Sequence, residues 1–118
     1  MRQERRAVPR LQCYLPIRLF LLGQRRLIQT LTKDLGLGGL RCLSPVVTPA
    51  STPLSLELTL GAGHRPVSLR AQVVWIKEVP HSDQFQFGLS FQELSEEDTK
   101  LLSTYLTKLS LQSSPAVV

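Results

Sequence analysis

The sequence predicts a mainly β protein, a small six-stranded antiparallel β-barrel with a C-terminal α-helix packed against it. Two observations support this fold class. Short segments in which apolar residues occupy every second position follow one another at short spacing, with Gly- and Pro-containing turns between them, as is typical of small barrels. After residue 94 the apolar period lengthens to that of a helix. At 118 residues the chain is long enough for one domain with a buried core.

The expected strands differ in how clearly the pattern defines them. In chain order they cover residues 11–22, 27–32, 40–43, 54–60, 67–77 and 85–91. The clearest pattern lies at 54–60, where leucine occupies every second position. Pro16 has no N–H to give to a sheet, so within the first strand it suits an edge or a bulge. The expected connections are 23–25, the Pro-rich segment 44–53, 61–64 and 80–84.

A helix is expected over residues 94–109. Ser95 is followed three residues later by Asp98, a variant of the capping box, and the acids at 96–98 suit the positive end of the helix dipole. Five residues at helical spacing form one apolar face: Leu101, Leu102, Tyr105, Leu106 and Leu109. The chain therefore divides into a basic arm (1–10), the barrel (11–93), the helix (94–109) and a flexible tail (110–118).

Positive charge is concentrated in the N-terminal third of the chain. Residues 1–41 contain nine Lys and Arg and two acids, whereas residues 42–118 contain five Lys and Arg and seven acids. This asymmetry indicates an anionic partner near the N-terminal part, whether a small ligand, a nucleic acid or a protein.

Several functional classes are disfavoured. The apolar segment 11–22 is interrupted by polar residues and Pro16, which argues against a signal peptide or a membrane span and favours a cytoplasmic location. Cys13 and Cys42 have no metal-ligand spacing and are expected to be buried free thiols. His64 and His81 lie in polar turns with no nucleophile beside them, so no enzyme is predicted. Basic and aromatic residues are not interleaved, and there are seven aromatic residues in all, which disfavours nucleic-acid binding.

Two stretches carry candidate binding residues. Arg5, Arg6 and Arg10 lie in the arm, where Pro9 favours extended backbone, and guanidinium can clamp a phosphate or stack on a purine. The second stretch, residues 34–39, combines Asp34 with three glycines. Taken alone, the first stretch is also typical of a solvated tail, and the second of a tight turn that needs positive φ.

Together the two stretches resemble the PilZ domain, a family of bacterial receptors for the second messenger cyclic di-GMP. Arg6 and Arg10 match its RxxxR motif, and Asp34, Gly36 and Gly39 match its (D/N)xSxxG motif. Segments 73–75 and 87–91 and the terminal helix extend the resemblance over about residues 4–109. The resemblance implies a PilZ-type barrel, cyclic di-GMP as the ligand, no cofactor or metal, and signalling through an unidentified downstream protein rather than through DNA or membrane insertion.

The resemblance also suggests roles for these residues. Arginine can donate a fork of hydrogen bonds to guanine N7 and O6, and Asp34 could accept from guanine N–H groups or orient an arginine. Binding would order the arm. In PilZ domains an arginine just before RxxxR accompanies two stacked ligand molecules, and Arg5 stands there. Gly36 replaces the motif serine, so one hydrogen bond worth about 0.5–1.5 kcal/mol is lost. The alternative is therefore a degenerate PilZ-like protein–protein adaptor that does not bind the nucleotide.

Overall fold

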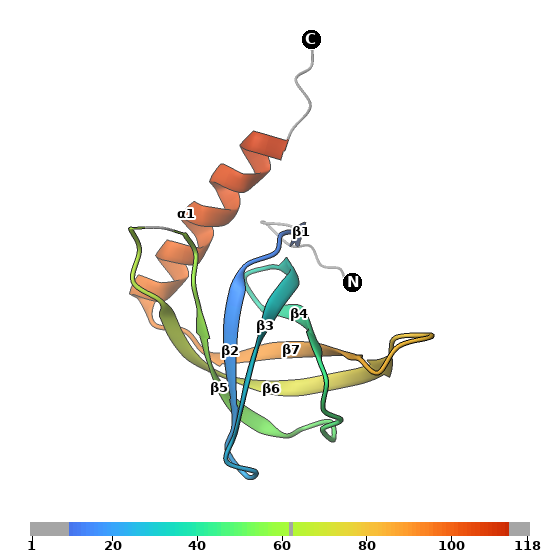
Figure 1. Cartoon of the computed structure of the whole chain (residues 1–118). Coiled ribbons are helices and arrows are strands. Elements are labelled where there is room, and N and C mark those ends of the chain that lie inside the picture. The colour runs from blue at the N-terminus through green and yellow to red at the C-terminus, as the bar shows by residue number, and fades with distance from the viewer. Residues whose placement is uncertain (1–9, 62, 114–118) are drawn as a thin grey trace, which may run out of the picture.

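The computed structural model describes residues 10–61 and 63–113, and it confirms a mainly β fold with a C-terminal helix (Figure 1). The elements in chain order are β1 (Leu11–Gln12), β2 (Pro16–Leu21), β3 (Arg26–Leu35), β4 (Gly39–Ser44), β5 (Pro53–Leu58), β6 (Val67–Glu78), β7 (Phe85–Glu93) and α1 (Glu96–Ser113).

The barrel is closed by the pairing of β4 with β3. Antiparallel pairs link the strands in the order β3-β2-β5-β6-β7-β4, and a further pairing of β4 with β3 completes the ring. These are the six expected strands. The short strand β1 is an addition that pairs with the C-terminal end of β3, Leu11 opposite Leu35 and Gln12 opposite Asp34.

The expected single strand over 11–22 is two strands. The Thr32 hydroxyl donates to the carbonyl of Cys13 at 2.6 Å and accepts from the N–H of Leu15 at 2.9 Å, so this side chain holds the irregular backbone between β1 and β2. Pro16 is the first residue of β2, a position compatible with its missing N–H. The interruption separates residue 10 and β1 from the regular wall of the barrel.

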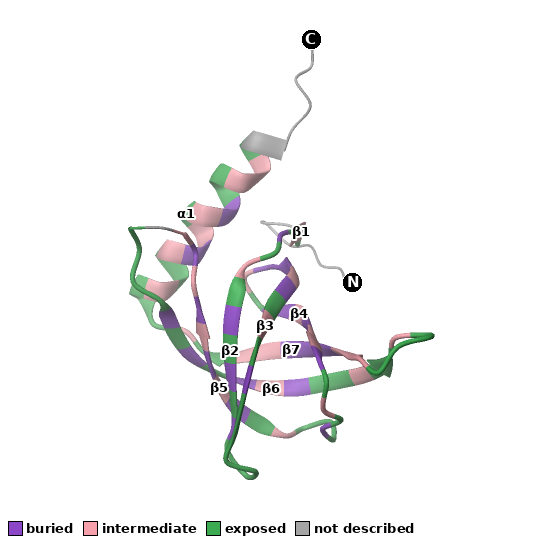
Figure 2. Ribbon diagram, viewed as in Figure 1, coloured by how far each residue is buried: buried purple, intermediate pink, exposed green. Residues whose placement is uncertain are grey.

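The core lies inside the barrel and beneath one face of α1. Along β2 buried residues alternate with exposed ones, as period-2 patterning requires (Figure 2). Leu102 and Leu106, one helical turn apart, are fully buried, and burying a leucine contributes about 1.5–3 kcal/mol. The helix packs at the end of the barrel that carries β1 and the turn between β5 and β6 (Figure 1).

The helix bounds differ from the expected 94–109. The N–H of Asp98 donates to the hydroxyl of Ser95 at 3.0 Å, so Ser95 caps the helix and Glu96 is its first residue. The helix continues to Ser113 because no glycine or proline occurs between Ser95 and Ser113. The first residues of the expected flexible tail are thus helical. In the described part of the chain, no helix combines the length and apolar character needed to cross a membrane.

Strands β6 and β7 fit closely because a glycine lies opposite a tryptophan. Trp75 pairs with Gly88, and a Cβ on Gly88 would overlap the Trp75 indole. A bulge between Val73 and Trp75 accompanies this pairing. This packing explains why Trp75 and Gly88, two of the residues that carried the family resemblance, occur at these positions.

Candidate ligand-binding site

Asp34 lies at the centre of the candidate site, and it belongs to a strand. The expected loop over 34–39 is shorter, because β3 runs to Leu35 and β4 begins at Gly39. Asp34 is paired with Gln12 on one side and with Arg41 on the other, so three strands fix its position. The residue is only 6 % exposed, an unusual environment for a carboxylate.

The two carboxylate oxygens of Asp34 are not equivalent. Oδ2 accepts a hydrogen bond of 2.6 Å from Nε of Arg41. Oδ1 is buried and has no hydrogen-bond partner in the described structure, and its ion-pair contact is Nε of Arg10 at 3.7 Å. Leaving a buried acceptor unsatisfied costs about 1–3 kcal/mol, so Oδ1 is available to a donor group that can reach it.

Arg10 approaches Asp34 across a glycine. A Cβ placed on Gly36 would lie 3.0 Å from Cγ of Arg10, so the aliphatic part of the arginine rests on the Gly36 backbone. The arginine side chain is 38 % exposed, which leaves its guanidinium accessible from solvent. The structure therefore brings Arg10 against Asp34 and Gly36, which lie far from it in the sequence. Arg5 and Arg6 lie outside the described residues.

Gly39 has a structural reason to be glycine. It lies opposite Ser90, and a Cβ on it would overlap the backbone carbonyl of Leu89 on β7. The turn between β3 and β4 is held by a 2.9 Å hydrogen bond from the Gly36 N–H to the Gly39 carbonyl. Neither Gly36 nor Gly39 has a positive φ, so this tight turn does not need the positive φ that the sequence suggested; the glycines with positive φ are Gly61 and Gly63.

Arg41 is a site residue that the sequence analysis missed. It lies on β4 directly opposite Asp34, and its second contact is a 3.3 Å hydrogen bond to Oε1 of Gln86 on β7. No motif marks it. The useful signal was the cross-strand pairing, but a register shift between Thr32 and Asp34 makes that pairing unreadable from residue spacing. Two guanidinium groups thus face one carboxylate, which leaves a positive surplus for an anion.

The thiols near the site are unreactive by environment. Both cysteines are free and buried, as expected. Burial raises the pKa of the Cys13 thiol, opposed by its hydrogen bond with Thr32 and reinforced by the Asp34 charge. Burial also raises the pKa of Cys42, to about 12. In residues 10–61 and 63–113 no three His, Cys, Asp or Glu side chains gather as metal ligands would.

Comparison with known proteins points to one family. The family model described as PilZ domain matches residues 2–108. The structure of Bacillus subtilis Inhibitor of motility (MotI/DgrA) is similar, with a TM-score of 0.80 and 22 % identity over 96 % of this chain and 54 % of that one. The chain thus spans about half the length of MotI/DgrA. No curated protein gave a match.

Two further similar structures are of proteins with bound cyclic di-GMP. The PilZ domain of Escherichia coli YcgR with c-di-GMP has a TM-score of 0.69 and 17 % identity, covering 97 % of this chain and 100 % of that one. The K. pneumonia MrkH–c-di-GMP complex has a TM-score of 0.74 and 15 % identity, covering 94 % of this chain and 55 % of that one. At these identities the similarities establish the shared fold.

Proposed function

Because this chain belongs to the PilZ domain family, we propose that it is a receptor and effector that binds cyclic di-GMP through Arg6, Arg10 and the segment 34–39. The observation that carries the proposal is the convergence of Arg10 on Asp34 across Gly36, which joins the two motifs in one place. We expect it to act in the cytoplasm, as a receptor rather than an enzyme.

The chemistry of the site suits a guanine nucleotide. The exposed guanidinium of Arg10 can donate to the N7 and O6 edge of guanine, and its charge attracts the phosphates. Oδ1 of Asp34, which has no hydrogen-bond partner, is the complementary acceptor for guanine N–H donors. Arg41 holds Oδ2 and thereby fixes the carboxylate plane. The cyclic di-GMP in the related YcgR and MrkH structures agrees with this assignment.

Signalling would start at the arm. Arg10 directly precedes β1, and β1 pairs with β3 at Asp34 and contacts α1. A ligand held between Arg6, Arg10 and Asp34 would fix the chain N-terminal to β1, and a downstream protein would recognise the ordered arm.

The second candidate is a PilZ-like adaptor without nucleotide binding. One observation favours it. The motif serine is Gly36, and the stem of Arg10 lies within 3.0 Å of the position where a side chain would begin. In this alternative the Arg10–Asp34–Arg41 group stabilises the end of the barrel, and another surface binds the partner.

Isothermal titration calorimetry separates these candidates. The chain is titrated with cyclic di-GMP, cyclic di-AMP, GTP and a short DNA duplex. A receptor that reads guanine edges binds cyclic di-GMP far more tightly than cyclic di-AMP, because adenine places a donor where guanine has O6. Equal affinity for the two cyclic dinucleotides would show that only phosphate charge is read. No heat with either would favour the adaptor, and tight duplex binding would favour a nucleic-acid partner.

A further inference from the structure

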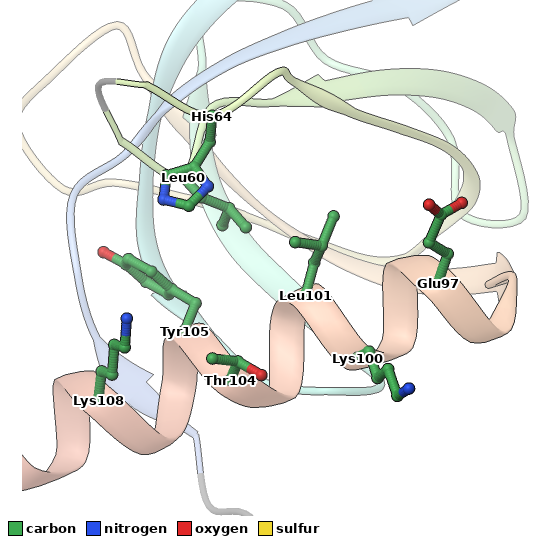
Figure 3. Close-up of a pocket in the computed structure, with 8 residues that line it drawn as sticks. All are labelled: Leu60, His64, Glu97, Lys100, Leu101, Thr104, Tyr105 and Lys108. Atoms are coloured by element: carbon green, nitrogen blue, oxygen red, sulfur yellow. The ribbon is translucent and has the colours of Figure 1, made fainter.

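A cavity lies between α1 and the turn that joins β5 to β6 (Figure 3). Its volume is about 320 Å³, at the lower end of the range for small-molecule sites. None of the candidate-site residues Arg10, Asp34, Gly36 and Arg41 lines it. It is therefore a separate feature of the described structure.

The inner part of this cavity is apolar. Leu101 and Tyr105 are one helical turn apart on α1, and Leu60 faces them from the segment that follows β5 (Figure 3). Leu60 is buried, whereas Leu101 and Tyr105 are half-buried because the cavity opens beside them. A ligand with an apolar chain would cover surface that the protein itself leaves partly open.

One end of the cavity is polar and basic. The Tyr105 hydroxyl, the Lys108 amine and the His64 ring gather at this end, while Glu97 stands at the opposite end (Figure 3). No ion pair in the described part of the chain involves Lys108 or His64. Glu97 pairs with Arg65 at 3.5 Å, so its charge is already countered. The unpaired positive charge of Lys108 at the basic end therefore attracts an anion.

We propose that this cavity binds a small amphipathic carboxylate, an unbranched chain of medium length with one carboxyl group. The chain lies over Leu60 and Leu101, and the carboxylate accepts from Lys108 and the Tyr105 hydroxyl. Both parts are needed, because an apolar floor alone would accept any hydrophobic group, whereas the unpaired ammonium selects a negative one.

The test uses decanoate as the probe, below the concentration at which it forms micelles. Amide shifts of the ¹⁵N-labelled full chain are followed during the titration. We expect saturable shifts confined to residues 60–64 and 97–108. The uncharged analogue decan-1-ol and the cationic decyltrimethylammonium should bind at least about tenfold more weakly, since each lacks the charge-assisted bond.

Variants identify the basic end. Lys108→Glu and the milder Lys108→Met should weaken decanoate binding about tenfold or more. Lys77→Glu makes the same charge change at an exposed site on β6 and should alter it less than about twofold. Decanol binding as tightly as decanoate would show that the basic end does not select a carboxylate, and the proposal would be wrong. Shifts scattered outside the cavity, or equal effects of the Lys77 and Lys108 variants, would also overturn it.

Discussion

Nε of Arg41 on β4 donates a 2.6 Å hydrogen bond to Oδ2 of Asp34, the residue directly opposite it on β3. The bond satisfies one carboxylate oxygen from within the barrel wall and leaves the other facing Arg10. A structural cation and a candidate ligand-binding cation thus share one buried acid. Stability and binding can therefore be separated by substituting the two arginines individually.

Arg41→Ala should destabilise the barrel by about 1.5–3 kcal/mol, because it removes a charge-assisted hydrogen bond from a buried carboxylate. Urea unfolding followed by circular dichroism measures the change. The matched control is Arg18→Ala, which removes an exposed ion pair with Glu57 and should cost no more than about 1 kcal/mol. Equal losses in the two variants would show that the Asp34–Arg41 bond contributes no more to stability than an exposed ion pair does.

Gly36→Ser should raise the affinity for cyclic di-GMP modestly, by up to about tenfold, by restoring the hydroxyl of the motif. The backbone permits the change since φ at Gly36 is not positive, and the Arg10 stem must shift by only a few tenths of an ångström. Calorimetry and the melting temperature are measured together. A lower melting temperature without a gain in affinity contradicts the explanation based on the lost hydroxyl.

Gly39→Ala, unlike Gly36→Ser, should destabilise the protein. Its methyl group would overlap the Leu89 carbonyl, and a backbone atom cannot move aside as a side chain can. We expect a loss of about 1–3 kcal/mol or more in stability. If Gly39→Ala is as stable as the wild type, β4 and β7 can separate more easily than the structure indicates.

The different outcomes for these residues show what a sequence can reveal. The strand at 54–60 was readable because one face is buried and the other is not, so burial imposes period 2. Asp34 was placed in a loop because an acid beside three glycines is typical of a turn, and its strand position depends on pairing with both β1 and β4. Arg41 had no signal in its residue spacing. Its pairing with Asp34 follows a register shift, and register is a tertiary property.

The burial of Cys42 predicts a pH dependence of stability. Burial raises the pKa of Cys42 in the folded protein to about 12 from 9.0, so the folded state holds its proton more tightly than the unfolded chain. The stabilising contribution is therefore complete below about pH 9 and is lost as the pH rises towards 12, by several kcal/mol at about 1.4 per pKa unit.

The measurement is urea unfolding at pH 8, 9 and 10 for the wild type and for Cys42→Ala. The variant starts less stable because it leaves a small cavity, but its stability should fall less steeply with pH. Parallel pH profiles would show that the Cys42 thiol does not contribute to the alkaline loss.

The presence of Arg5 just before the RxxxR motif predicts how many cyclic di-GMP molecules the chain binds. Two stacked cyclic di-GMP molecules bring about four phosphate charges together, and a further guanidinium offsets that repulsion and can stack on an outer guanine. The wild type should therefore bind two molecules per chain, and Arg5→Leu closer to one. Arg10→Ala should abolish tight binding, costing about 1.5–3 kcal/mol.

Salt provides an independent check on Arg5. If its guanidinium pairs with the second ligand, raising the ionic strength should weaken the wild type more than Arg5→Leu, because more charge is paired in the wild-type site. Calorimetric titrations at low and high salt give both stoichiometry and affinity. A wild-type stoichiometry of one, with cyclic di-GMP still preferred over cyclic di-AMP, would refute the role of Arg5. It would leave the receptor proposal intact, because guanine selectivity is proposed to depend on Arg10 and Asp34 rather than on the number of ligands bound.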